Sequence, residues 1–236
     1  MKLLILESSG LVASVAVMDE EHLIGEYTIN YKKTHSQTLL PMVDALITNL
    51  GMELKELDAI GVSKGPGSFT GLRIGSATAK GLAQALDIPI VPVSSLEGLA
   101  ANLFGTKDLI CPIMDARRNQ VYTGVYRYEE GSLITVKEPC PLPVKDLLDF
   151  LNEYGMPVIF LGDGVPVYKE QIEEKITVPV CFAPSHLNRQ RAGAVGFLAL
   201  QYFREGKIEA AREHKPEYLR KSQAERELEE KQRVQK

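Results

Sequence analysis

The stretch from residue 58 to residue 81 constrains the fold of this chain more than any other part of the sequence. A short apolar run at Ile60–Val62 is typical of a buried strand. A Gly-Pro-Gly turn follows at 65–67, and then comes a segment rich in small residues that we expect to be helical at about 70–86. A strand, a glycine turn and a helix in this order can direct backbone N–H groups at an anion. The unit is typical of a mixed α/β fold.

The glycine turn matches neither of the common phosphate-binding loops. A Walker loop would close with Gly-Lys followed by Ser or Thr, which is missing here. The third glycine, Gly71, stands one position too late for a dinucleotide-binding Gly-x-Gly-x-x-Gly pattern. We therefore favour a tight structural turn formed by Gly65, Pro66 and Gly67 over a phosphate-binding role. We expect Gly67 to take a backbone conformation that is hard for other residues.

Small residues gather on one side of the expected helix that follows the turn. Glycine inside a helix costs about 0.8–1 kcal/mol relative to alanine, so Gly75 and Gly81 each require a packing reason. The close approach of another helix supplies one, because the distance between helix axes depends on the side chains in contact. That neighbour belongs either to the same chain or to another subunit. The residues that share this side are Gly71, Gly75, Thr78, Ala79 and Leu82.

Composition places the chain among ordinary globular proteins. The 236 residues are 44% hydrophobic and 25% charged, enough for one large domain or two small ones. A net charge of −4 argues against free-standing nucleic-acid binding, which usually requires a basic surface. No apolar run approaches a membrane span and no signal peptide opens the chain, so we expect a cytoplasmic protein without membrane contact. The widely spaced Cys111, Cys140 and Cys181 suggest a reducing compartment rather than disulfides or zinc.

The periodicity of the apolar residues predicts a mixed sheet with helices on its faces. The helix expected at 34–50 has Thr34 and Gln37 at capping-box spacing, and Pro41 either kinks it or marks its effective start. Other helices are expected at 70–86, 96–104, Val144–Glu153, Pro166–Lys175 and Ala192–Arg204. The expected strands are Lys2–Glu7, Val12–Met18, Leu23–Ile29, Ala59–Ser63, Ile90–Pro92, Leu109–Met114, Val121–Tyr128, Leu133–Val136 and Pro157–Leu161.

Several short motifs occur in a fixed order along the chain. They are Leu6-Glu7-Ser8-Ser9, His35-Ser36-Gln37 with Leu40-Pro41, Gly65–Gly75, Pro92-Val93-Ser94-Ser95-Leu96, Asp115-Ala116-Arg117 and Pro216-Glu217-Tyr218-Leu219-Arg220. In this set and order, residues 1–220 resemble the TsaB (YeaZ) family. Its members are bacterial subunits of the tRNA threonylcarbamoyladenosine machinery and homologues of TsaD. Glu7 departs from the family, which commonly has Asp at this position.

The resemblance implies a fold and a role. The fold class is α/β, the actin/Hsp70-like (ASKHA) two-lobed fold with mixed β-sheets flanked by helices. We expect an N-terminal lobe with the interface helices at 1–110, a C-terminal lobe at 111–220 and a charged tail, helical or disordered, at 221–236. The role is that of a non-catalytic scaffold and dimerization subunit that binds and supports catalytic TsaD. With the ATPase TsaE, that complex transfers threonylcarbamoyl to adenosine 37 of tRNAs that read codons beginning with A.

The same resemblance implies the partners and cofactors. The chain is expected to form a heterodimer with TsaD, to meet TsaE through that complex, and to form a homodimer when isolated. No cofactor is expected in this chain, whereas ATP and a metal are expected in the partner subunits. tRNA is expected only as a ligand of the whole complex. The pairs Lys32-Lys33 and Arg117-Arg118 could contribute to tRNA binding, although we favour solvated surface charge.

Catalytic equipment is missing where the resemblance would place it. The catalytic homologue holds a metal through two histidines at i and i+4 of a helix, in a stretch similar to Val93–Leu99. Here Ser95 and Leu99 stand at those two positions, and Leu cannot ligate a metal. The four histidines of the chain offer no other metal-binding spacing. We therefore predict no metal site and no catalytic residue.

Other polar residues leave alternatives open. His35 in the first turn of a helix is either an interface contact or a locally hydrogen-bonded surface residue. Asp115 is either an acid or metal ligand of a cleft or, as we favour, a partner of Arg117 or Arg118. The competing functions are a small ASKHA ATPase, an M22-like glycoprotease or peptidase, and a free nucleotide-binding regulator. The hydroxyls of Ser8 and Ser9, with no nearby lysine, would make a weak nucleotide site.

Two helices are predicted to form the interface with TsaD or with a second copy. The helices expected at 34–50 and 70–86 carry more apolar or small residues than one sheet-facing stripe requires. We expect the same pair of helices from a homologous chain to pack on them, with Gly75 at the closest approach. The predicted interface residues are His35, Leu39, Leu40, Met42, Val43, Leu46, Ile47, Leu72, Gly75, Ala79, Leu82 and Leu86.

Overall fold

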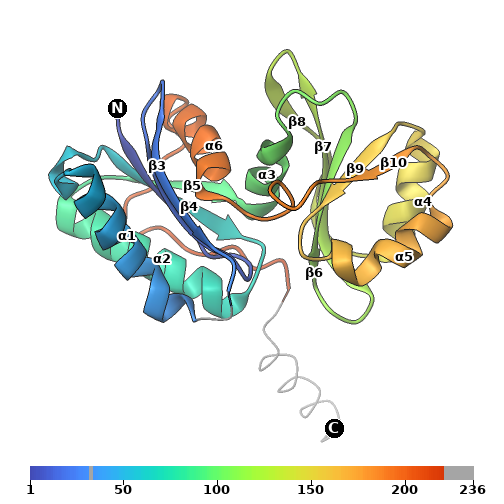
Figure 1. The fold of residues 1–236 in the computed structure, drawn as a ribbon, viewed down its shortest axis with the longest axis horizontal. Helices are drawn as coiled ribbons and strands as arrows, with labels where there is room; N and C mark the ends of the chain where they lie inside the picture. The colour runs from blue at the N-terminus through green and yellow to red at the C-terminus, as the bar shows by residue number, and fades with distance from the viewer. Residues whose placement is uncertain (32–33, 221–236) are drawn as a thin grey trace, which may run out of the picture.

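Two five-stranded mixed sheets, each flanked by helices, form two lobes that lie side by side (Figure 1). The computed structural model describes residues 1–31 and 34–220. The pair Lys32-Lys33 and the charged tail at 221–236 lie outside the described residues. Strand order is β3-β2-β1-β4-β5 in the first sheet and β8-β7-β6-β9-β10 in the second, so the same order is used twice. The predicted two-lobed α/β fold with mixed sheets is confirmed.

The first sheet is covered on both faces, which explains why its strands read as nearly continuous apolar runs. Every residue of β1 and β2 is buried. β1 pairs antiparallel with β2 and parallel with β4. One face packs against α1 and α2, and the other packs against α6. The strands are Leu3–Glu7 (β1), Ala13–Met18 (β2), Leu23–Ile29 (β3), Ala59–Gly65 (β4) and Ile90–Ser94 (β5), and the helices are His35–Leu50 (α1), Phe69–Leu86 (α2) and Ala192–Arg204 (α6).

The second sheet packs against α4 and α5 on its outer face and against α3 on the face toward the first lobe (Figure 1). β8 is an edge strand, which allows it to contain Pro139, Pro141 and Pro143 although proline cannot donate a backbone hydrogen bond. The strands are Leu109–Asp115 (β6), Gln120–Glu129 (β7), Ser132–Pro143 (β8), Val158–Leu161 (β9) and Val180–Phe182 (β10). The helices are Ser95–Ala100 (α3), Val144–Tyr154 (α4) and Val165–Lys175 (α5), with short 3-10 turns at Leu54–Glu56 and Ala101–Leu103.

Helix α6 returns from the second lobe to the first. Its Val195, Leu198 and Ala199 pack with residues of β1, β2 and β5. The second sheet begins along the chain with β6, at Leu109. The expectation that all of 111–220 belongs to the second lobe is wrong for α6, because the uncovered face of the first sheet needs an apolar partner and α6 supplies it.

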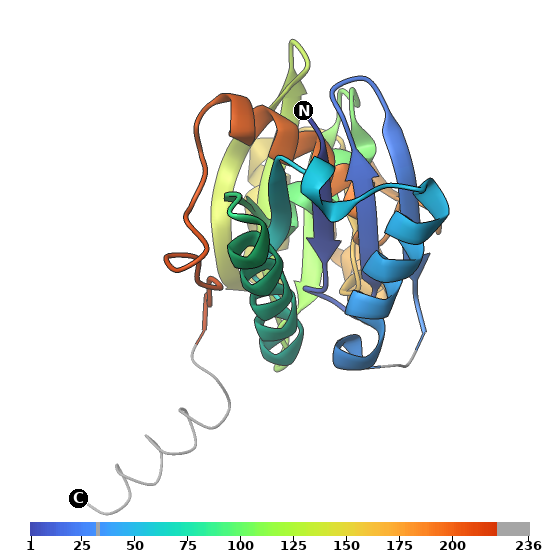
Figure 2. The ribbon, with the colours of Figure 1, turned by 90° about the vertical axis from the view of Figure 1, so that its left-hand side faces the viewer.

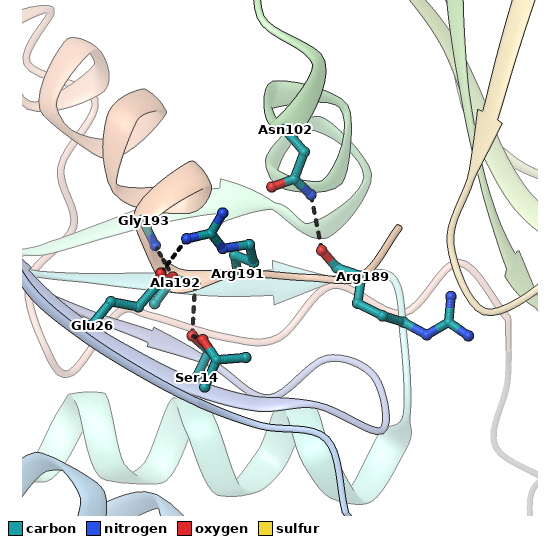
Figure 3. Close-up of polar contacts among 8 residues, drawn as sticks. Ser14, Glu26, Asn102, Arg189, Arg191, Ala192 and Gly193 are labelled. Carbon is teal, nitrogen blue, oxygen red and sulfur yellow. Dashed lines mark hydrogen bonds and ion pairs between the residues drawn. The ribbon is translucent and has the colours of Figure 1, made fainter. Parts of the chain in front are cut away.

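The segment that leads into α6 is held at both ends by polar contacts (Figure 3). The Asn102 side chain donates to the carbonyl of Arg189 at 2.9 Å. Glu26 on β3 accepts from Arg191 at 2.5 Å and from the backbone N–H of Gly193 at 2.9 Å. The hydroxyl of Ser14 accepts from the N–H of Ala192 at 2.9 Å. These strand residues satisfy the free N–H groups at the start of α6, and they fix its position on the first sheet.

One alternative and two local predictions are overturned. α1 begins at His35 and runs through Pro41, so of the two alternatives for the proline, the one in which it marks the helix start is excluded. Thr34 is the N-cap residue, but its side chain makes no capping hydrogen bond, and the predicted capping box is absent. β8 is much longer than the predicted Leu133–Val136, because its prolines fall on an edge strand. No helix among the described residues is long and apolar enough to cross a membrane.

Candidate functional site

A cleft of about 1170 Å³ opens between the two lobes. Its first-lobe wall is formed by the β1–β2 turn and by the N-terminal ends of α1 and α2. Its second-lobe wall is formed by the end of β6 and the β6–β7 turn, including Asp115 and Arg117. Arg220, near the end of the described chain, also lines it.

The glycine turn packs directly against the β1–β2 turn. Gly65 has a φ of +127°, which favours glycine, whereas the φ of Gly67 is not positive. A Cβ at Gly67 would lie 2.2 Å from the carbonyl oxygen of Ser9, and the N–H of Ser68 donates to that oxygen at 2.7 Å. The prediction of an unusual conformation at Gly67 is therefore wrong, and close backbone contact is what requires glycine there. These contacts favour a structural role for the glycine turn over a phosphate-binding role.

Glu7 and its neighbours form a buried network beneath the cleft. The carboxylate of Glu7 accepts from the N–H and the hydroxyl of Ser9, both at 2.6 Å, and from the hydroxyl of Ser63. Burial raises the pKa of the Glu7 carboxyl, although these hydrogen bonds lower it. Ser8 donates its hydroxyl to the carbonyl of Gly71 at 2.9 Å. The hydroxyls considered for a weak nucleotide site are thus bonded within the chain.

His35 is half-buried at the rim of the cleft and contacts its own chain. Its Nε2 lies 2.9 Å from the carbonyl oxygen of Gly10. A carbonyl only accepts, so Nε2 carries the proton and donates. Of the two readings that the sequence left open, this geometry matches the locally hydrogen-bonded histidine.

Asp115 binds the turn that follows it through the backbone. One of its carboxylate oxygens accepts from the N–H of Arg117 at 2.9 Å and from the hydroxyl of Tyr168 at 3.1 Å. Within residues 1–31 and 34–220 no ion pair joins it to an arginine, so its contact with Arg117 runs through the backbone and not through a salt bridge. Burial, with the nearby carboxylate of Asp115, raises the pKa of Tyr168 to about 12. Burial also raises the pKa of Asp163, which accepts from the N–H of Asp115.

The two positions that the family resemblance aligns with metal ligands, Ser95 and Leu99, lie inside the protein core. Ser95 and Leu99 are both 0% exposed on α3, and Leu99 packs with Leu96 and Tyr126 between the lobes. Glu97 of the same helix accepts from the hydroxyl of Tyr202 at 2.9 Å, and burial raises its pKa. Within the part of the chain that the structure describes, no group of three or more His, Cys, Asp or Glu residues could hold a metal ion.

Most of the predicted interface residues belong to the core of the first lobe. Only Leu40, at 53%, is exposed, and His35, Leu82 and Leu86 are half-buried. The buried ones present no surface to a partner, so their selection was wrong; they face the sheet or the facing helix. They are Leu39, Met42, Val43, Leu46, Ile47, Leu72, Gly75 and Ala79.

The exposed face of α2 carries a different stripe of small residues. Ala77, Gly81 and Ala85 are exposed at i+4 spacing, and Arg73 lies one turn before them. A Cβ at Gly81 would meet no atom of the described residues within 4 Å. We call Arg73, Ala77, Gly81 and Ala85 the outer stripe. α1 and α2 stand side by side in front of the first sheet (Figure 2). The sequence analysis identified only the side that contains Gly75, and spacing alone does not reveal which side of the helix faces the sheet.

Comparison with known proteins identifies the family. The family model for TsaD, tRNA N6-adenosine threonylcarbamoyltransferase, matches residues 22–228. The tRNA threonylcarbamoyladenosine biosynthesis protein TsaB of Bacillus subtilis is 40% identical over 227 residues, which cover 95% of this chain and 96% of that protein. The chain belongs to the TsaB family. The TsaB of Escherichia coli is 27% identical over 228 residues, with the same coverage of both chains, 95% and 96%.

Solved structures of TsaB relatives share this fold. The structure of YeaZ from Pseudomonas aeruginosa superimposes with a TM-score of 0.75 at 28% identity and covers 92% of this chain and 99% of its own. A second structure from that organism, described as similar to peptidase YEAZ, has a TM-score of 0.78 at 28% identity, with coverages of 93% and 99%. TsaB membership confirms the resemblance that the ordered motifs suggested and places the chain in tRNA threonylcarbamoyladenosine biosynthesis.

Proposed function

We propose that this TsaB chain is a non-catalytic scaffold subunit that docks on TsaD through the exposed faces of α1 and α2. In that complex it supports the transfer of threonylcarbamoyl to adenosine 37 of tRNAs that read codons beginning with A. TsaE joins through the TsaB–TsaD pair, and tRNA binds only the assembled complex. The isolated chain forms a homodimer through the same face, while ATP and a metal belong to the partner subunits.

The outer stripe of α2 carries this proposal. A helix surface made of Ala77, Gly81 and Ala85 lets the backbone of a second helix approach closely, because no side chain projects between them. Leu40 of α1 adds an apolar side chain that is 53% exposed. Glycine at 81 has no packing reason among residues 1–31 and 34–220, since a Cβ there would be unobstructed by them. A partner helix supplies the missing reason.

The core around α3 supports a non-catalytic role. Ligands of a metal must project into a space that the metal and a substrate can enter. Ser95 and Leu99 instead lie in a packed core. The hydroxyls of Ser9 and Ser63 bond to the carboxylate of Glu7 rather than to a histidine, an arrangement that gives little support to a serine-peptidase function.

The substitution Gly81→Arg tests the interface. It places a long cation on the exposed stripe, and an arginine is a better helix residue than glycine, so the fold should hold. Asp149→Arg, at an exposed position of α4, is the matched control, because it adds a cation to a helix surface in the other lobe. Position 75, which the sequence analysis placed at the closest approach of the helices, is unsuitable for this test because a side chain there would meet Ser8.

The readouts are the oligomeric state of the pure chain by light scattering and the capture of TsaD. We expect Gly81→Arg to be a folded monomer that no longer captures TsaD, while Asp149→Arg behaves as wild type. A folded Gly81→Arg variant that stays dimeric and binds TsaD would place the interface elsewhere. Metal analysis and a nucleotide titration of the cleft distinguish the scaffold from an ATPase or a nucleotide-binding regulator.

A further inference from the structure

The chain after α6, residues 205–220, runs back along the first lobe; we call it the C-terminal segment. It begins at the free edge of β5, where Ile90 and Glu209 exchange two backbone hydrogen bonds of 2.9 and 2.8 Å. His214 is 1% exposed, and its Nδ1 lies 2.9 Å from the carboxylate of Glu209. Lys80 of α2 donates to the carbonyl of His214 at 3.1 Å. This part of the segment is therefore fixed to both β5 and α2.

The next residues pack on the glycine turn. The N–H of Glu217 donates to the carbonyl of Lys64 at 2.7 Å, and the two side chains form an ion pair at 2.8 Å. A Cβ at Gly65 would lie 2.3 Å from the carbonyl oxygen of Glu217, so glycine at 65 also makes room for the segment. The ring of Tyr218 stacks on Phe69, with centroids 4.5 Å apart and planes 7° apart. Figure 2 shows the segment descending beside α2.

Arg220 then reaches the second lobe. Its guanidinium donates to the carbonyl of Ala116, in the β6–β7 turn, at 2.9 Å. Arg220 and Ala116 both line the cleft. The segment thus starts on the first sheet and ends on the second lobe across the mouth of the cleft.

Arg73 connects this segment to the outer stripe. Its Nε–H donates to the hydroxyl of Tyr218 at 3.1 Å, and its guanidinium lies 6.0 Å from the ring centroid of Phe69 and 5.8 Å from that of Tyr218. Arg73 precedes Ala77 by one helical turn on the exposed face. A helix docked on Ala77 and Gly81 therefore meets a side chain whose position is set by Tyr218.

We propose that the C-terminal segment couples docking on the outer stripe to the relative position of the two lobes. This inference rests on the proposed function, because it needs a partner on α2. A docked partner restricts the side chain of Arg73, which in turn fixes Tyr218 through its hydrogen bond to the hydroxyl. Because only one residue separates Tyr218 from Arg220, a fixed Tyr218 keeps the Arg220 guanidinium on the carbonyl of Ala116. Coupling is reciprocal, so a loosened segment also weakens docking.

Distances between spin labels test the coupling. The labels go on Glu21→Cys in the first lobe and Glu170→Cys in the second, both exposed, in a chain with Cys140→Ser and Cys181→Ser; Cys111 is buried. Arg220→Ala removes the anchor on the second lobe. Arg212→Ala is the control, because Arg212 lies in the same segment but is exposed and pairs with its neighbour Glu213. Circular dichroism checks that each variant is folded.

We expect the free Arg220→Ala variant to show a broader distance distribution than the wild type and the control. TsaD should narrow the distribution of the wild type and the control but not that of Arg220→Ala. The affinity of Arg220→Ala for TsaD should fall about fivefold or more, a typical size for coupling between sites. Tyr218→Phe, which keeps the ring stack and removes the hydroxyl held by Arg73, should leave the free distribution unchanged and abolish the narrowing.

Two outcomes overturn the inference while the proposed function stands. One is an Arg220→Ala distribution equal to that of the wild type, and the other is full narrowing by TsaD in Tyr218→Phe. If TsaD binds none of the proteins, including the wild type and the control, the proposed function fails and the inference falls with it.

Discussion

The hydroxyl of Ser8 occupies the space that a side chain at Gly75 would need. A Cβ at Gly75 would lie 2.3 Å from Ser8 Oγ, which itself donates to the carbonyl of Gly71 at 2.9 Å. The β1–β2 turn is thus seated directly on α2. The glycines on this side of the helix serve the packing of the chain itself, whereas Gly81 faces away from it.

Alanine substitutions at three glycines of α2 should separate these roles. Gly71→Ala would meet the carbonyl oxygen of Ser8 at 2.1 Å and should cost about 1–3 kcal/mol, as overpacking does. Gly75→Ala should cost less, because the Ser8 hydroxyl can rotate away with the loss of one hydrogen bond. Gly81→Ala should stabilise by about 0.8–1 kcal/mol through helix propensity. Urea denaturation measures all three, and equal effects would contradict the assignment.

Gly67→Val should lower the thermal unfolding temperature clearly. The reason is the contact with the Ser9 carbonyl oxygen, 2.2 Å from the added Cβ, and not the backbone conformation of residue 67. Gly67→Ala should therefore be nearly as harmful as Gly67→Val. Calorimetry provides the measurement. Unchanged stability together with lost nucleotide binding would instead favour a phosphate-binding loop.

The buried carboxyl of Glu7 should make stability depend on pH. Its folded pKa is raised above the ordinary 4.5 by burial, so above that pH the folded state holds a proton that the unfolded state has released. This contribution is fully present below about pH 4.5 and is lost as pH rises through the folded pKa. Glu7→Gln keeps the shape but cannot ionise.

The measurement is the free energy of unfolding of the wild type and Glu7→Gln over a range of pH. The stability of Glu7→Gln should rise relative to the wild type as the pH increases from 4.5. Glu170→Gln, at an exposed position of α5, is the control, and its free energy of unfolding should follow the same pH profile as that of the wild type. A constant difference between Glu7→Gln and the wild type would mean that Glu7 does not titrate in this range.

Removal of the Glu26 carboxylate should loosen α6 from the first sheet. Glu26→Ala leaves Arg191 and the N–H of Gly193 without their acceptor (Figure 3). The loss should resemble that of a helix N-cap, about 0.5–2 kcal/mol. Glu26→Gln keeps an acceptor and should cost less. Hydrogen exchange of the α6 amides reports the effect, and protection equal to that of the wild type in Glu26→Ala would exclude this anchor.

The purified chain should neither hydrolyse ATP at a meaningful rate nor modify tRNA by itself. Ser95 and Leu99, which stand where the family resemblance would place two metal ligands, are both buried. Elemental analysis and a phosphate-release assay test this expectation. Stoichiometric iron or zinc, or turnover that survives rigorous purification, would contradict it.

The sequence predicted the positions of helices and strands better than it predicted which face of a helix packs against the sheet. Ile60–Val62 and the helix after the glycine turn follow from apolar runs and small residues, and β4 and α2 confirm them. Helical periodicity defines stripes, but only the fold decides which stripe faces the sheet. Gly75 and Gly81 looked equivalent for this reason, although a Cβ at Gly75 would meet Ser8 and one at Gly81 would meet no described residue within 4 Å.

Contacts between residues that are far apart in the sequence could not be predicted from local sequence patterns. Nothing within Ala192–Arg204 reveals that it covers the first sheet rather than the second. The motif at Pro216–Arg220 was visible, but its stacking on Phe69 and its contact with Ala116 depend on the folded arrangement of both lobes. The short β10, with three residues, carries too little periodicity to be predicted.

The placement of α6 governs the order in which this protein can mature on the ribosome. A nascent chain that has emerged only as far as residue 110 holds all the strands of the first sheet, but it lacks α6, the helix that buries Leu3, Ile5 and Val93. This helix is translated only after every strand of the second sheet. The first lobe therefore cannot complete its core before the strands of the second have been translated, and a gene cut between the lobes would yield a first fragment prone to aggregate.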